Sequence, residues 1–235
     1  MQTQLYALLN TITERVTQHL RLYQPEKLHI IILGDMAHGA IHVSARVASE
    51  EDTVEQLMHV SEILANVIAN LAEHVNSIDV HCTYGNHMRT VQNKADSKHT
   101  DNLERIIPWW LSQRFAESGN IAIQPGAANE FIYLDILGWG VVATHGDLER
   151  FASYGVTAHT LFSKTVGANV DYALMADRHH LESKEALAVD TIICPALCGT
   201  DEYANSKRLY ATPAQLMIMF NKEDGAECRI PIRLK

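Results

Sequence analysis

The chain has 235 residues, of which 47% are hydrophobic, 20% charged and 7% aromatic. This composition excludes collagen-like, mucin-like and wholly disordered chains, and the length is enough to bury a sizeable core. The net charge of −9, with histidine counted as neutral, excludes a basic surface over the whole molecule of the kind that binds nucleic acid. Any contact with nucleic acid therefore needs a local basic patch, or cations that neutralise the phosphates.

The sequence gives no sign of a membrane protein or of an exported one. No apolar run approaches the ~20 residues that a bilayer span requires, and the first residues lack the pattern of a signal peptide. The cysteines have no spacing typical of a disulfide framework, so we expect a reduced, cytoplasmic protein without membrane contact. They are Cys82, Cys194, Cys198 and Cys228.

Helices and strands are predicted to alternate in the first half of the chain. Apolar residues recur at helical spacing over residues 3–22 and 51–75, and a third helix is expected at 101–117. Short β-branched runs at 28–33 and 78–83 are typical of buried strands.

Strands are predicted to dominate the second half, with one helix at 155–166 between two of them. We find no internal repeat and no linker, and so expect a single α/β domain over residues 1–235. The strands expected here cover residues 130–137, 139–144, 170–175, 189–194 and 214–221.

Polar motifs follow four of the predicted strands, at the carboxyl ends where α/β proteins place their ligands. The motifs are Gly34-Asp35, Gly85-Asn86-His87, His145-Gly146-Asp147 and Asp177-Arg178-His179-His180. Asp, Asn and His bind divalent metals, and glycine permits the sharp turn that exposes them. Each motif alone is explained as well by a turn or a helix cap. Their order along the chain is what points to a metal centre.

This ordered set resembles the motifs of the calcineurin-like metallophosphoesterases, and most of all those of phage and prophage members described as DNA repair exonuclease-like. The resemblance runs through residues 34–52, 84–89, 144–147, 176–180 and 199–215. It implies an α/β fold, a four-layer α-β-β-α sandwich of two mixed sheets, here lacking the first strand. It also implies a metal-dependent phosphodiesterase, with a phage-type DNA nuclease as the specific expectation.

The resemblance also implies a role for each matching residue. Asp35 matches the carboxylate that bridges two metals, Asn86 and His145 match ligands of the second metal, and His179 matches a ligand of the first. His87 matches the catalytic histidine that protonates the leaving group or stabilises the transition state. One or two divalent ions are implied, with Mn²⁺ as the first choice and Mg²⁺ or another divalent ion as alternatives.

Two departures from the family pattern bear on the first metal. A D-x-H motif should precede the first helix, but residues 1–27 contain no Asp. The missing strand is either lost, supplied by another polypeptide, or excluded by a start codon placed too late. Asp79-Val80-His81 has the right letters but lies inside a predicted strand, and we interpret it as ordinary strand alternation.

The second departure is Ala176-Asp177, where the family has Gly-His. Asp177 is either a substitute metal ligand or a carboxylate paired with Arg178. With these changes the first metal retains Asp35 and His179 only, so a mononuclear or an empty site is a real alternative to a dinuclear one.

Four further residues are candidates for substrate contacts: His38, Arg89, Tyr203 and Asn205. His38 follows Asp35 closely, an Arg guanidinium fits phosphate bidentately, and the last two lie in a polar loop after a strand. Each has an ordinary alternative as a turn or as solvated surface. A long apolar first helix beside a missing strand also leaves apolar surface to cover, so we expect at least a dimer with residues 3–22 near the interface.

Three functions fit these observations. The first is a phosphodiesterase acting on DNA, the second a catalytically lapsed relative acting as a binding or regulatory module, and the third a phosphoesterase of nucleotides. The missing D-x-H motif favours the second. The retained Asp35, Asn86, His87 and His145 favour the first and the third.

Overall fold

The structure is a computed structural model, and its described residues gather into two compact units, Met1–Glu130 and Phe131–Lys235. It describes residues 2–39, 41, 49–98, 100–124, 130–165, 167–200, 205, 208 and 210–234, with side chains from residue 6 onward.

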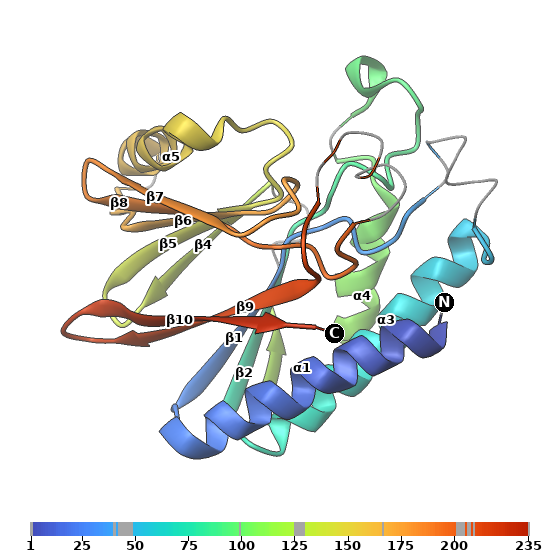
Figure 1. The fold of residues 1–235 in the computed structure, drawn as a ribbon, viewed down its shortest axis with the longest axis horizontal. Helices are drawn as coiled ribbons and strands as arrows, with labels where there is room; N and C mark the ends of the chain where they lie inside the picture. The colour runs from blue at the N-terminus through green and yellow to red at the C-terminus, as the bar shows by residue number, and fades with distance from the viewer. Residues whose placement is uncertain are drawn as a thin grey trace. The chain divides into compact units, whose positions relative to one another are not determined.

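The first unit is built on a three-stranded parallel sheet in the order β1-β2-β3 (Figure 1). Parallel neighbours require crossover connections, and helices provide them here. The strands are β1 (Lys27–Ile32), β2 (Ser77–Cys82) and β3 (Ile121–Ile123). The helices are α1 (Gln2–Tyr23), α3 (Thr53–Ala72) and α4 (Ile106–Arg114), with 3₁₀ turns η1 (Lys94–Asp96) and η2 (Leu103–Arg105).

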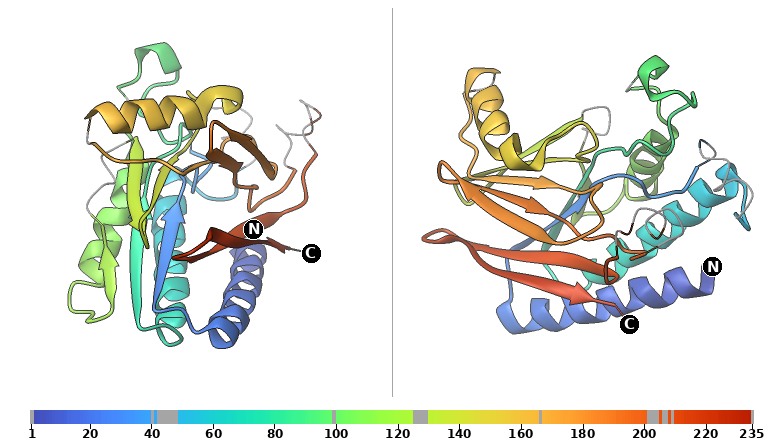
Figure 2. Two further views of the ribbon diagram at one scale, coloured as in Figure 1. Left: turned by 90° about the vertical axis from the view of Figure 1, so that its left-hand side faces the viewer. Right: turned by 45° about the horizontal axis from the view of Figure 1, so that its top comes forward.

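The crossover helix α3 is fixed at its start by a capping box and along its length by an apolar face. Asp52 accepts hydrogen bonds from the backbone of Val54 and Glu55, while the Glu55 side chain accepts from the backbone of Asp52. The buried face of α3 packs on β2, where Ile78 and Val80 are fully buried. Figure 2 shows α1 running beside α3, and the two helices are in contact.

The second unit holds a five-stranded mixed sheet in the order β4-β5-β6-β8-β7 and a separate β9–β10 hairpin. The central strands β5, β6 and β8 are parallel, and helix α5 lies against β6, β7 and β8 (Figure 1). The strands are β4 (Phe131–Ile136), β5 (Trp139–Thr144), β6 (Tyr172–Met175), β7 (Glu182–Ala186), β8 (Val189–Ile193), β9 (Ala214–Asn221) and β10 (Gly225–Arg233). Helix α5 covers Phe151–Thr165.

The α/β class and the strands that carry the motifs are confirmed. The strand expected at 28–33 pairs in parallel with the one expected at 78–83, as β1 and β2. The helix expected at 101–117 is shorter, because Asn102 caps a 3₁₀ turn from which α4 then begins. Strands β3, β7 and β10 were not expected from the sequence. No helix among the described residues is both long and apolar enough to cross a membrane.

Part of the apolar face of α1 is buried within the first unit. Val16 and Leu20 are buried, and α1 contacts α3, whereas Leu22 and Tyr23 near its end are exposed. The dimer expected from this helix stays a prediction.

Candidate metal centre

Two glycine turns meet where β1 and β2 end. Gly34 has φ +84°, in the left-handed region that favours glycine, and a Cβ placed on it would lie 2.2 Å from the backbone nitrogen of Gly85. A Cβ on Gly85 would in turn lie 2.0 Å from Oδ1 of Asp35. The two glycines therefore allow the Gly-Asp and Gly-Asn-His turns to approach each other closely.

This approach brings Asp35 into contact with the Gly-Asn-His turn. The His87 backbone N–H donates to Asp35 Oδ1 at 3.0 Å, and His87 Nε2 lies 3.7 Å from Asp35 Oδ2. Asp35 itself has φ +52°, a strained conformation for a residue with a Cβ that costs of the order of 1–3 kcal/mol. Asn86 lies in the same turn and is half-buried. The two motifs thus form one set in the first unit.

A buried carboxylate that sequence reasoning missed holds these two turns together. Glu104 is 3% exposed, and its Oε2 accepts from the backbone N–H groups of Asp35 at 3.1 Å and Gly85 at 2.7 Å. Its Oε1 accepts from the backbone N–H of Met36. Asn102 Nδ2 donates to the Gly85 carbonyl oxygen at 2.7 Å, so the N–H and the C=O of Gly85 are both hydrogen-bonded to side chains. Glu104 is a positioning residue for Asp35 and for the Gly-Asn-His turn.

The charge on Glu104 also affects the pKa of a thiol in strand β2. Burial raises the pKa of the Cys82 thiol to about 12, and the Glu104 carboxylate contributes to the rise. Cys82 is therefore an inert, protonated thiol at neutral pH.

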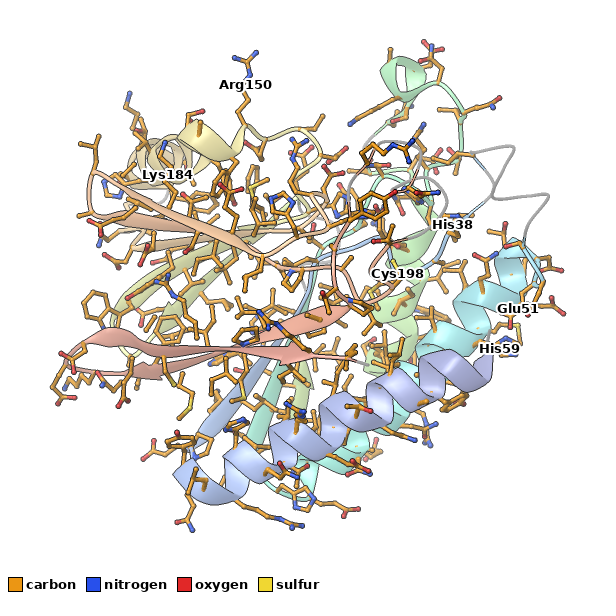
Figure 3. The ribbon with its side chains drawn as sticks, in the orientation of Figure 1. His38, Glu51, His59, Arg150, Lys184 and Cys198 are labelled. Atoms are coloured by element: carbon orange, nitrogen blue, oxygen red, sulfur yellow. The ribbon has the colours of Figure 1, made fainter. Side chains whose placement is uncertain are left out.

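Two of the expected substrate contacts lie beside this set. The centroids of the His38 and His87 rings lie 5.5 Å apart. His38 is exposed and is labelled in Figure 3. The backbone N–H groups of His38 and Gly39 donate to the Gln56 side chain of α3. The Arg89 guanidinium donates to the carbonyl oxygens of its own loop, including that of Asn86 at 2.7 Å. Arg89 therefore has a structural role, and a role in binding phosphate stays a prediction.

The second unit brings its own polar residues together at the ends of β5 and β6. These strands are parallel neighbours, so the residues that follow them meet at one edge of the sheet. The buried His145 has its Nε2 3.7 Å from Asp177 Oδ1. Asp177 Oδ2 also lies 3.6 Å from Nε of the exposed Arg178, so the pairing with Arg178 that the sequence offered as one alternative is present. The role of Asp177 as a metal ligand stays a prediction.

His179 has one buried ring nitrogen, Nδ1, without a hydrogen-bond partner among the described residues. Asp177 and His179 have φ +58° and +64°, so the segment that carries them is locally strained, as Asp35 is. An unpaired buried nitrogen is costly, and a bound cation would remove that cost.

The remaining expected contacts are placed differently. Tyr203 lies outside the described residues. Asn205 accepts a hydrogen bond from the Tyr210 hydroxyl at 2.7 Å, and Arg208 Nη1 lies 3.3 Å from the same hydroxyl. These contacts give Asn205 a role inside its own loop, and a substrate contact there stays a prediction.

The donors in the two sets fit a divalent cation. Asp35 and Asn86 offer oxygen ligands in the first unit, and His145, Asp177 and His179 offer imidazole and carboxylate ligands in the second. The buried Nδ1 of His179 and the close approach of His145 to Asp177 are the observations that favour this use over simple turn chemistry.

No family model matches the chain. It is 21% identical over 206 residues to the SPbeta prophage-derived uncharacterized protein YonJ of Bacillus subtilis (strain 168), a match that covers 84% of this chain and 50% of that protein. The chain therefore spans about half the length of this relative.

Several solved structures are similar to this one at low sequence identity. A novel archaeal phosphodiesterase is 15% identical, with a TM-score of 0.44 over 93% of this chain and 90% of its own. The hypothetical protein PH1004 of Pyrococcus horikoshii OT3 is 11% identical, with a TM-score of 0.48 over 98% and 84%. Wild-type Vps29 of Entamoeba histolytica in complex with Zn²⁺ is 12% identical, with a TM-score of 0.37 over 88% and 99%. These scores are low, so the resemblance to the calcineurin-like metallophosphoesterases rests on the ordered motifs and on the geometry of the turns that carry them.

Proposed function

We propose that this protein is a metal-dependent phosphodiesterase. The observation that carries the proposal is the contact between the Gly-Asp and Gly-Asn-His turns, in which the His87 backbone donates to Asp35 at 3.0 Å. Turn chemistry alone does not require a carboxylate and an imidazole to face each other with 3.7 Å between Asp35 Oδ2 and His87 Nε2. A carboxylate ligand beside a proton donor is the arrangement that phosphodiester cleavage needs.

The proposed metal ligands are Asp35 and Asn86 in the first unit, and His145, Asp177 and His179 in the second. The order of the motifs along the chain supports a metal-binding role for each set. A divalent ion bound there supplies Lewis acidity, and we propose Mn²⁺ as the ion used.

His87 is the proposed catalytic residue. Its backbone is fixed to Asp35 Oδ1, so the ring is held beside the carboxylate while remaining half-exposed. The imidazole can then donate a proton to the leaving oxygen of the substrate. His38, whose ring is 5.5 Å from that of His87, is placed to contact the same substrate group.

The finer proposal is a phage-type DNA nuclease. Its support is the phage and prophage resemblance of the motifs, together with a relative whose name describes it as prophage-derived. The net charge of −9 gives mild support to the competing proposal of a small nucleotide substrate. A direct comparison of single-stranded DNA, duplex DNA and cyclic nucleotides as substrates separates these two.

The test is hydrolysis of bis(4-nitrophenyl) phosphate with Mn²⁺. We expect weak metal-dependent turnover, abolished by Asn86→Ala and lowered about 10²- to 10⁴-fold by His87→Ala, the range typical of a lost general acid. His59→Ala is the matched control, because His59 pairs with Glu51 on α3, away from the turns (Figure 3). Turnover that survives Asn86→Ala would contradict the proposed centre. No Mn²⁺ binding and no turnover in the wild type would instead favour a lapsed phosphoesterase fold acting as a binding module.

A further inference from the structure

A second group of metal-binding side chains lies on one face of the parallel sheet, within the strands and not at their ends. His29 of β1 is in register with Asp79 of β2, and His81 follows two residues later on the same face. His29 Nδ1 lies 3.3 Å from His81 Nε2 and 3.9 Å from Asp79 Oδ2. One ligand atom from each of the three residues lies within 4.8 Å of the other two.

Strand alternation explains how these side chains meet. Ile78 and Val80 point to the face of β2 that packs on α3, and both are fully buried. Asp79 and His81 must then point to the opposite face, as the sequence predicted. What the sequence could not supply is the parallel register, which adds His29 of β1 to the pair.

We propose that His29, Asp79 and His81 form a binding site for a borderline divalent transition metal, of which Zn²⁺ is the type. Two imidazoles and one carboxylate suit Zn²⁺ better than Mg²⁺ or Mn²⁺, which prefer oxygen ligands. In a tetrahedral site with bonds of about 2.0–2.1 Å, ligand atoms stand about 3.3–3.4 Å apart. The distance between the two imidazole nitrogens already matches this value, and the carboxylate needs a small movement toward them.

The protonation states favour the same use. Burial lowers the pKa of His81 to about 4, with the neighbouring His29 adding to the effect, and burial also lowers the pKa of His29. Both rings are therefore neutral at neutral pH. In the hydrogen bond between His29 Nδ1 and His81 Nε2, one facing nitrogen donates and the other accepts. Binding an ion would need that one proton to move to the other nitrogen of its own ring, and because both rings are neutral no ring proton would be released.

Lys27 competes with the ion for the carboxylate. Its Nζ lies 2.8 Å from Asp79 Oδ2, and its side chain is 46% exposed. Burial alone would raise the pKa of Asp79, but the hydrogen bond and charge of Lys27 hold it below its ordinary value. Lys27 is thus the cation that a metal would displace, and its exposed stem leaves it room to swing into water.

The competing explanation is a hydrogen-bonded network of Lys27, Asp79 and the two histidines that binds no ion. The two explanations make opposite predictions for Lys27. Removing the lysine weakens such a network, whereas it strengthens a metal site because a competing positive charge is lost.

The experiment is a titration of the full chain with Co²⁺, followed by its visible absorption and by displacement with Zn²⁺. It is done in an Asp35→Asn/His145→Ala background, so that ions held by the two candidate ligand sets at the strand ends do not contribute. We expect a tetrahedral Co²⁺ spectrum, lowered in affinity at least about tenfold by His29→Asn or His81→Asn. Lys27→Met should raise the affinity, by up to about fivefold. His59→Asn, a histidine paired with a carboxylate outside the group, should leave it unchanged.

Three results would overturn the proposal. They are the absence of a tetrahedral spectrum in the Asp35→Asn/His145→Ala protein, a spectrum that persists in both histidine variants, and a loss of affinity in Lys27→Met. Far-ultraviolet circular dichroism checks that each variant is folded. If the variant at the buried His81 fails to fold, the one at the half-buried His29 decides, because its side chain is 20% exposed and its loss is easier to tolerate.

Discussion

Replacing Glu104 is the change that most directly tests how the candidate centre is built. The carboxylate is 3% exposed and accepts three backbone N–H groups, those of Asp35, Met36 and Gly85. Hydrogen bonds to a charged group contribute about 1.5–3 kcal/mol each, and a buried donor left without a partner is costly. Glu104→Ala orphans three donors at once, so we expect a loss of about 3–5 kcal/mol in the free energy of unfolding, after allowing for water that enters the gap.

Glu104→Gln should be milder for a reason visible in the bond pattern. Its amide oxygen can keep the two bonds that Oε2 makes, to Asp35 and Gly85, while its NH₂ group faces the N–H of Met36. The hydrogen bond from the Met36 N–H is lost, and this N–H then faces the NH₂ group of the glutamine, a second donor. We therefore expect the free energy of unfolding to fall by about 1.5–3 kcal/mol. The assay is urea unfolding followed by circular dichroism, with Mn²⁺ affinity measured by calorimetry on the same samples.

The control for this series is Glu51→Gln. Glu51 pairs with His59 at the start of α3, and its loss should cost less than about 1 kcal/mol and leave Mn²⁺ affinity unchanged (Figure 3). If Glu104→Ala unfolds at the same urea concentration as the wild type, the carboxylate does not hold the two turns. If Gln and Ala cost the same, the proposed division of bonds between Oε1 and Oε2 is wrong.

Three further predictions follow from the same structure. Gly85→Ala places a Cβ 2.0 Å from Asp35 Oδ1, so Mn²⁺ affinity and turnover should both fall at least about tenfold, whereas Gly119→Ala, in open space, should leave them unchanged. Because the folded pKa of His81 is about 4 against an ordinary 6.5, its stabilising contribution is complete above pH 6.5 and is lost as the pH falls toward 4. In the presence of a chelator, the free energy of unfolding should fall over this range by at most about 3 kcal/mol, and His81→Asn should flatten the dependence. Light scattering at high micromolar concentration should show at least a dimer, and a clean monomer would contradict the expectation drawn from the first helix.

The local parts of this fold could be predicted from the sequence. Strands β1 and β2 contain β-branched residues, and a glycine follows each of them shortly after its last residue, so both their positions and the polar turns that follow them were found. Strand β7 was missed because its residues, Glu182–Ala186, are polar and mostly exposed, and so carry no apolar pattern. Strand β10 was missed because Pro231 interrupts its apolar residues, which a hairpin tolerates at an edge.

The parts of the sites that depend on distant contacts could not be predicted. Glu104 acts on backbone N–H groups as far as 69 residues away, and no side-chain pattern in the sequence records such a partner. His29 meets His81, 52 residues further along the chain, only through the parallel register of β1 and β2. By contrast, Asp35 and His87 were found because each lies in a short motif with its own glycine.

The central claim is that Asp35 and Asn86 bind a divalent cation, and Mn²⁺ calorimetry on single variants tests it most directly. Asp35→Asn and Asn86→Ala each remove one oxygen ligand from the two turns that meet in the first unit. We predict that each variant alone loses the same Mn²⁺ binding event, and that the double variant loses nothing more. Mn²⁺ binding at this event that survives in either variant would contradict the claim.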